Sequence, residues 1–157
     1  MKWVTREKAK VDRIACPWLI KRFVDPEAEF LFVPADKVNE TAKKEGATPF
    51  DSPGVELTHY KDGDKQFVSF DAVIRKYHLN DPGLLELAKI VRGADAKIPD
   101  APAESAGLEA AAAGFRMIAK DDHDNMRIQF PYYDALYQFC KGRAAGAAAL
   151  EHSKPSS

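Results

Sequence analysis

Short apolar runs separated by polar stretches dominate the first third of the chain and predict strands around a helix. Residues 2–5 predict a short opening strand. A helix is expected from Pro17 to Phe23, because proline suits the first turn of a helix, where its missing N–H costs no hydrogen bond. Residues 29–33 read Glu-Phe-Leu-Phe-Val and predict a strand buried on both faces.

The middle of the chain predicts one polar helix and one hairpin. Residues 36–44 indicate a surface helix with Asp36 as its N-cap, ended by Gly46. Residues 55–60 and 65–69 flank a glycine-containing turn, which is typical of a β-hairpin. The sheet is therefore expected in the first half of the chain.

Helical spacing of apolar residues dominates the second half. The expected helices cover residues 70–77 after the cap Ser69, 82–92, about 104–119, and a last segment beginning at Pro131. The prediction is an α+β fold with a small sheet in the first half and a mostly helical second half. We expect a single domain over residues 1–142 and a flexible tail over residues 143–157.

Composition narrows the class of protein. The chain has 157 residues, which suits one domain, and 45% of them are hydrophobic. Its 23 basic and 24 acidic residues leave a net charge of -1, so no global positive field favours nucleic acid. No apolar run approaches the roughly 18 residues of a membrane span, and the charged N-terminus is unlike a secretory signal. We expect a cytoplasmic protein that binds neither nucleic acid nor membrane.

Cys16 is a candidate catalytic residue. At the start of a helix, its thiol would feel the positive end of the helix dipole, which favours thiolate. The alternative is a small buried residue before Trp18, since free cysteine is usually a core residue. The chain has only two cysteines and no Cys-x-x-Cys, which weakens dithiol redox chemistry.

His59 and Glu56 are candidate metal ligands. An inward histidine in a strand needs a partner for each ring nitrogen, and that partner is a metal, a carboxylate or a backbone carbonyl. Residues three apart in a strand face opposite ways, so Glu56 would join His59 only through a bulge or a turn.

Asp122 and His123 form a second candidate set. Helical spacing from Ile118 places Asp122 on the inner side, and histidine beside carboxylate suits a divalent metal (Zn, Fe or Mn) or general acid–base catalysis. The alternative is a solvated capping cluster. Tyr133 completes the candidate catalytic set, although aromatic residues at helical spacing are more often core.

Arg13, Arg22 and Arg92 are candidate substrate-binding residues. Planar guanidinium groups bind oxyanions through paired hydrogen bonds. The alternative for each is surface charge at the end of a helix.

Five motifs in order make the chain similar to a known family. They are VDRIACPWLI at residues 11–20, PGVELTH at 53–59, IVRGAD at 90–95, DDH at 121–123 and YDALY at 133–137. Together they resemble the chromate-resistance ChrB domain family from about Lys2 to Lys141. The resemblance implies a role in bacterial chromate resistance, as a domain that senses or handles the oxyanion. Some family members carry an additional N-terminal region linked to DNA-binding regulation, and the family is also labelled as exported.

Three hypotheses follow. In the first, His59, Asp122 and His123 hold a divalent metal while the arginines neutralise an anionic substrate, in an enzyme or an oxyanion-processing protein. In the second, the domain is a non-catalytic chromate or anion sensor that acts through a protein partner. In the third, Cys16 reduces chromate directly and has a low pKa. A homo-oligomer is compatible with all three.

Overall fold

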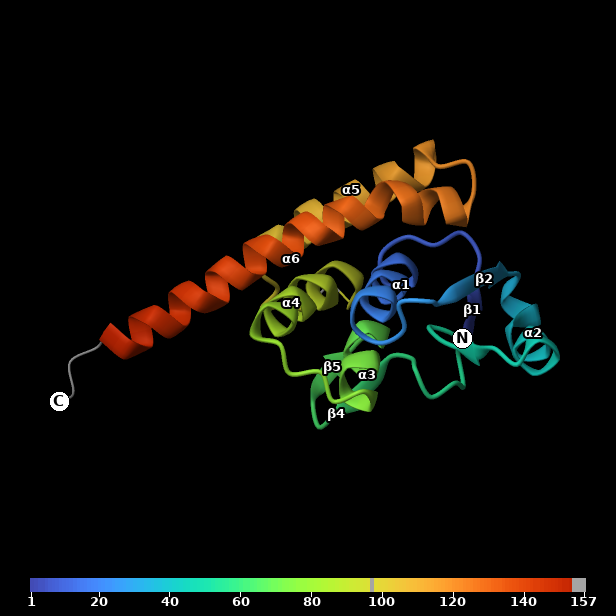
Figure 1. Cartoon of the computed structure of the whole chain (residues 1–157), viewed down its shortest axis with the longest axis horizontal. Coiled ribbons are helices and arrows are strands. Elements are labelled where there is room, and N and C mark those ends of the chain that lie inside the picture. The colour runs from blue at the N-terminus through green and yellow to red at the C-terminus, as the bar shows by residue number, and fades with distance from the viewer. Residues whose placement is uncertain (97, 154–157) are drawn as a thin grey trace.

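A three-stranded parallel sheet forms the N-terminal part of the computed structural model, which describes residues 1–96 and 98–153. Strand β1 (Lys2–Arg6) lies between β2 (Glu29–Val33) and β3 (Thr48–Pro49). Parallel neighbours need a crossover, and helix α1 (Asp12–Phe23) connects β1 to β2. Figure 1 shows this helix beside the sheet. The strands expected at residues 2–5 and 29–33 are confirmed.

Strand β2 is less buried than its sequence indicates. Phe30 is buried, but Leu31, Phe32 and Val33 are only partly buried. The expected burial on both faces is wrong because β2 is an edge strand. The fully buried strand residues are instead residues 3–5 in the middle of β1, the central strand.

Helix α1 begins five residues before the expected start. It runs from Asp12, so Pro17 lies inside the helix. An internal proline removes one helical hydrogen bond and costs about 3 kcal/mol. Full burial of Trp18, Leu19 and Ile20 on this helix offsets that loss. Cys16 is therefore in the interior of the helix, and its expected position at the N-terminus is wrong.

The segment after β2 follows the predicted pattern with shifted ends. A short 3₁₀ helix, η1 (Ala35–Lys37), precedes α2 (Val38–Glu45), which ends at Gly46 with a φ of 64°. Asp36 does not cap α2 because it lies inside η1. Gly46 ends the helix as expected, since glycine adopts the left-handed region without strain.

The hairpin is shorter than expected. Strands β4 (Tyr60–Asp62) and β5 (Lys65–Phe67) pair antiparallel across a turn that holds Gly63 at a φ of 62°. Residues 55–59 lie outside this ladder. His59 thus directly precedes β4 rather than facing inward from the middle of a strand, and the ladder does not fix its side chain.

Four helices complete the described chain: α3 (Ser69–Lys76), α4 (Pro82–Ala96), α5 (Glu104–Ile118) and α6 (Asp122–Ser153). Helix α6 packs against α1, α4 and α5, and its last turns extend past the rest of the molecule (Figure 1). The expected start of this helix at Pro131 and the expected end of α4 at Gly93 are both wrong. Beyond Gly142 the described chain remains helical as far as Ser153. The α+β class is confirmed, and none of the described helices has the length and apolarity to cross a membrane.

Trp18 anchors α1 to α6. Its ring lies 6.1 Å from that of Tyr133 and 5.8 Å from that of Tyr137. Its Nε1–H donates a hydrogen bond of 2.8 Å to Asp134 on α6. The long helix therefore holds α1 in place, and with it the acidic side chain that begins α1.

Candidate metal centre

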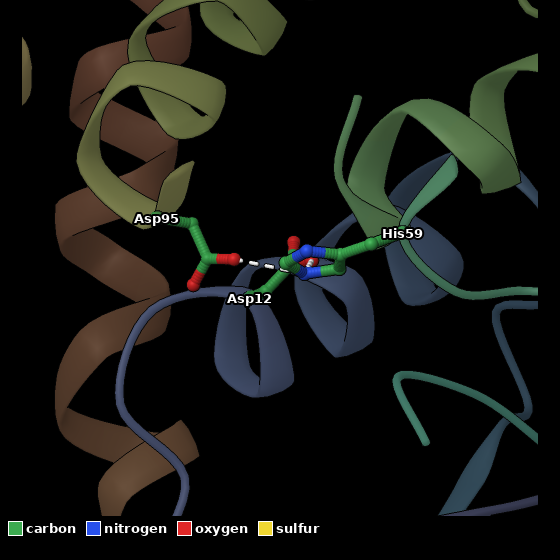
Figure 2. Close-up of side chains that lie close together, drawn as sticks. All are labelled: Asp12, His59 and Asp95. Atoms are coloured by element: carbon green, nitrogen blue, oxygen red, sulfur yellow. Dashed lines mark ion pairs between the residues drawn. The ribbon is translucent and has the colours of Figure 1, made fainter. Parts of the chain in front are cut away.

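Three carboxylates surround one nitrogen of His59. Nε2 lies 2.9 Å from Oδ2 of Asp95, 3.4 Å from Oδ2 of Asp12 and 3.4 Å from Oδ1 of Asp51. Asp12 is the first residue of α1, Asp51 follows β3, and Asp95 lies in the last turn of α4. Figure 2 shows Asp12 and Asp95 approaching the imidazole of His59. Segments far apart in sequence therefore meet at one imidazole.

Asp12, His59 and Asp95 have the geometry of a metal-binding group. Each offers one ligand atom, and the three atoms lie within 4.8 Å of one another. Bonds of about 2.1 Å place neighbouring ligands about 3.0 Å apart in an octahedron and about 3.4 Å apart in a tetrahedron. The His59 separations of 2.9 and 3.4 Å fall in that range. The side chain of His59 is 39% exposed, so an ion can reach the group from solvent.

Asp12 is fixed by the start of α3. The backbone N–H groups of Ser69 and Phe70 donate to its two oxygens at 2.7 and 3.2 Å. The first N–H groups of a helix have no partner within the helix, so a carboxylate is well placed there. Each carboxylate oxygen has a second lone pair, which leaves Asp12 able to bind a cation.

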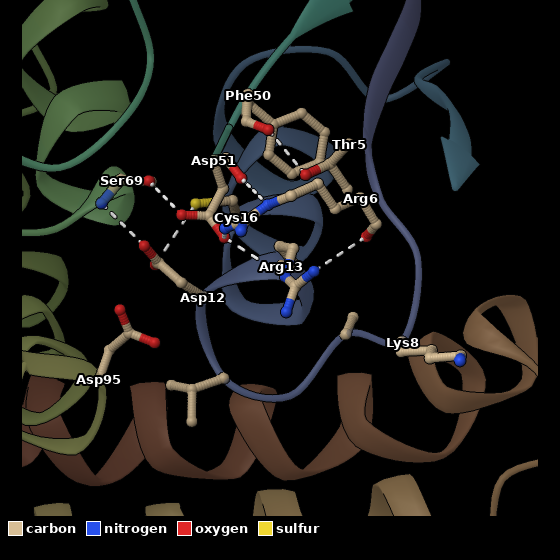
Figure 3. A network of polar contacts seen from close by, with 12 residues as sticks. Thr5, Arg6, Lys8, Asp12, Arg13, Cys16, Phe50, Asp51, Ser69 and Asp95 are labelled. Atoms are coloured by element: carbon tan, nitrogen blue, oxygen red, sulfur yellow. Dashed lines mark hydrogen bonds and ion pairs between the residues drawn. The ribbon is translucent and has the colours of Figure 1, made fainter. Parts of the chain in front are cut away.

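Asp51 belongs to a neighbouring ion-pair network (Figure 3). Its carboxylate accepts a hydrogen bond of 2.6 Å from the Ser69 hydroxyl. Its Oδ2 lies 3.5 Å from Arg6 and 3.4 Å from Arg13. Two guanidinium groups thus share the charge of Asp51, whereas no arginine pairs with Asp12 among the described residues.

The electrostatics of the cluster favour a positive charge at its centre. The carboxylates of Asp12, Asp51 and Asp95 raise the pKa of His59 to about 12. Burial, opposed by His59, raises the pKa of Asp12 to about 7. Burial would also raise the pKa of Asp51, but the donors of His59 and Ser69 outweigh it and lower that pKa. A metal ion that replaced the proton on His59 would meet the same attraction.

Cys16 and Tyr133 lie close to the cluster but are fully buried. The Cys16 thiol donates to Asp12 at 3.5 Å, and burial together with the charge of Asp12 raises the pKa of Cys16. The low pKa expected from a helix N-terminus is therefore not found. Burial also raises the pKa of Tyr133, whose hydroxyl donates to the carbonyl of Val11 at 3.4 Å. Cys16, within α1, and Tyr133, on α6, are therefore buried groups whose raised pKa favours the neutral form.

His123 and Glu56 are not brought together with His59. The ring of His123 packs edge-to-face on Phe32, at 5.4 Å. Glu56 is exposed and forms an ion pair of 2.7 Å with Lys76. Among the described residues, the potential metal-binding group contains neither of them. The expected convergence of the two histidines is wrong, because the carboxylates of Asp12, Asp51 and Asp95 surround His59 while His123 packs on Phe32 of β2.

Asp122 supports a loop. Its carboxylate accepts the backbone N–H groups of Lys8 and Ala9 at 2.9 and 2.7 Å. This contact fixes the connection between β1 and α1 at the start of α6. Asp122 is not a member of the group around His59, and its described contacts contribute to the position of α1.

The three candidate arginines each pair with a carboxylate. Arg13 is 3.4 Å from Asp51, next to the cluster. Two hydrogen bonds of 3.0 and 3.1 Å join Arg22 to Asp134 on α6. Arg92 forms a similar pair with Asp71, described below. Arg13 alone of the three borders the candidate metal centre.

Sequence reasoning missed Asp12, Asp51 and Asp95 as site residues. Asp12 and Asp95 stand inside two of the five motifs, Asp12 next to Arg13 and Asp95 three residues after Arg92. The available signal was that these two aspartates share their motifs with the candidate residues Arg13 and Arg92. Nothing in the spacing indicated that these aspartates face one histidine.

Comparison with known proteins places most of the chain in one family. Residues 3–140 match the family described as ChrB, C-terminal domain. Protein ChrB of Cupriavidus metallidurans is 38% identical over 138 residues, which cover 86% of this chain and 39% of that relative. No solved structure matches the chain. The chain belongs to the ChrB C-terminal domain family.

Proposed function

We propose that the domain binds a divalent metal ion through Asp12, His59 and Asp95 and uses this centre to bind a small oxyanion in chromate resistance. The observation that carries the proposal is the meeting of two carboxylates with one ring nitrogen, at 2.9 and 3.4 Å. The family and the name of the relative support the link to chromate resistance. Because the chain spans 39% of that relative, the activity of the longer protein is not carried over.

The donor set limits the choice of metal. Two carboxylates and one imidazole are ligands that suit Mn²⁺, Fe²⁺ or Zn²⁺, and the fully buried Cys16 is protonated and pairs with Asp12. Three protein ligands are typical of sites with an open coordination position. When bound, the metal would supply positive charge for an anion at that position.

Neighbouring groups suit the same role. The N–H groups of Ser69 and Phe70 orient Asp12, as outer partners commonly orient metal ligands. Arg6 and Arg13 neutralise Asp51, which reduces the negative charge that an approaching oxyanion would meet.

Metal analysis of protein prepared without an affinity tag or chelator tests the centre. We expect about one equivalent of metal, and a loss of more than tenfold in Mn²⁺ or Zn²⁺ affinity in Asp95→Asn and His59→Gln. Glu56→Gln is the matched control, because Glu56 is an acid near His59 in sequence that pairs with Lys76 instead. Equal metal affinity in all four proteins would exclude the centre.

Calorimetry with chromate, and with sulfate for comparison, tests whether the proposed centre binds an oxyanion. We expect saturable binding to the metal-loaded protein and weak binding after chelation. Equal binding with and without metal would contradict the role of the metal. Recovery of all the chromate unchanged would favour the non-catalytic sensor over an enzyme.

A further inference from the structure

A cavity separate from the metal centre lies between the β4–β5 hairpin and the C-terminal end of α4. Its volume is about 520 Å³. The lining residues come from the hairpin, from α4 and from the segment after it: Asp64, Lys65, Gln66, Phe67, Lys89, Arg92, Ala96, Ile98, Pro99, Asp100 and Pro102. A cavity of this size is within the range of roughly 300–1,000 Å³ that small-molecule sites occupy.

Arg92 is held rigidly at this cavity. Its Nε and Nη2 donate to the two oxygens of Asp71 at 3.0 and 2.7 Å. Its guanidinium also stacks on the ring of Phe67, at 4.9 Å from the ring centre. Asp71 is itself fixed, because it accepts the backbone N–H of Val68 at 3.0 Å. The guanidinium is therefore oriented before any ligand arrives.

The opposite edge of this guanidinium remains available. Asp71 uses the Nε–Nη2 edge, and no residue in the described part of the chain accepts a hydrogen bond from Nη1. The Nη1–Nη2 edge has the spacing that binds a carboxylate or phosphate through two parallel hydrogen bonds. Arg92 lines the cavity, and its side chain is 21% exposed.

The remainder of the lining is apolar inside and charged at the rim. Phe67, Ile98 and Pro102 are partly buried. The other charged lining residues are exposed, namely Asp64, Lys65, Lys89 and Asp100. The charges of these four residues balance, and Asp71 offsets the charge of Arg92. The hydrogen-bond donors of the Nη1–Nη2 edge, and not a net positive charge, therefore favour an anion.

We propose that this cavity binds a small organic anion, a carboxylate or phosphate ester with an apolar body, through the Nη1–Nη2 edge of Arg92. The apolar body would contact Phe67 and Ile98. None of Asp12, His59 and Asp95 lines the cavity, so this site does not depend on the metal centre.

Heteronuclear NMR on the whole chain tests the proposal with four probes of one size and with inorganic phosphate. We expect phenyl phosphate and benzoate to shift the backbone amides of residues 64–67 and 89–96 in a saturable manner. Benzyl alcohol, which lacks the charge, and benzylamine, which reverses it, should bind at least fivefold more weakly. Inorganic phosphate should also bind more weakly, because it has no apolar body.

Variants locate the binding. Arg92→Gln should weaken phenyl phosphate at least tenfold and leave benzyl alcohol unchanged. Gln66→Trp, at an exposed hairpin position, should weaken both by filling the cavity while leaving the Arg92–Asp71 pair intact. Arg127→Gln is the matched control, an exposed arginine paired with Asp124 on α6. Absence of saturable shifts with both anions, or equal shifts in Gln66→Trp and the control, would overturn the proposal.

Discussion

The protonation state of His59 follows from its surroundings. In the metal-free protein its three carboxylate neighbours raise the pKa to about 12. A raised pKa means that the stabilising contribution of the charged ring is complete below the unfolded value of about 6.5 and is lost as pH rises through about 12. Across the neutral range the ring is therefore an imidazolium.

NMR of the ring nitrogens tests this state. We expect the His59 resonances of the metal-free protein to keep imidazolium shifts from pH 5 to pH 9. Asp95→Asn removes the carboxylate at 2.9 Å and should lower the pKa of His59. A titration of His59 centred near pH 6.5 in the wild-type protein would show that the carboxylates do not raise the pKa of this ring in solution.

Burial of Cys16 predicts an unreactive thiol. The side chain is fully buried and its pKa is raised, so the thiolate needed for alkylation is scarce. We expect mass spectrometry to find Cys16 unmodified after iodoacetamide treatment of the native protein at pH 8, and modified in urea. Rapid alkylation of Cys16 in the native protein would contradict this prediction and would support the hypothesis that Cys16 reduces chromate directly.

Among the elements, the contact of α1 with α6 determines the position of Asp12. Trp18→Ala removes a fully buried aromatic side chain and its bond to Asp134. We expect the free energy of unfolding to fall by about 3–5 kcal/mol, measured by urea denaturation. Tyr137→Phe, which removes only the partly buried hydroxyl bonded to Asp81, should cost about 1 kcal/mol. Similar losses in the two variants would show that Trp18 is not the anchor.

Capping residues, glycine and proline positions and the spacing of apolar residues predicted most helices and strands, but not all of their first and last residues. Gly46 and Asp81 mark helix ends through backbone geometry and capping, which operate within a few residues. The start predicted at Pro17 was wrong because the local preference of proline for a first turn does not decide where α1 begins. The helix begins at Asp12, and most residues between Asp12 and Pro17 are buried by tertiary packing. His59 was recognised as a site residue, whereas its partners Asp12 and Asp95 required the tertiary packing of α1, α3 and α4.

At the scale of the whole molecule, we expect the last turns of α6 to be dispensable for the fold. The family match ends at residue 140, and most described side chains of residues 141–147 are exposed. Arg143 forms an ion pair with Glu104 there, and such surface pairs contribute about 0–1 kcal/mol. A chain ending at Gly142 should keep its unfolding free energy within about 1 kcal/mol. A larger loss in urea denaturation would assign this extension a role in stability.

The dispersal of Asp12, His59 and Asp95 along the chain has a consequence during synthesis. A nascent polypeptide on the ribosome cannot assemble the three donors until α4 has emerged from the exit tunnel. An ion bound at the proposed centre would therefore stabilise chains that extend past Asp95 over shorter ones. Metal binding would mark the emergence of α4 during synthesis, before α5 and α6 follow.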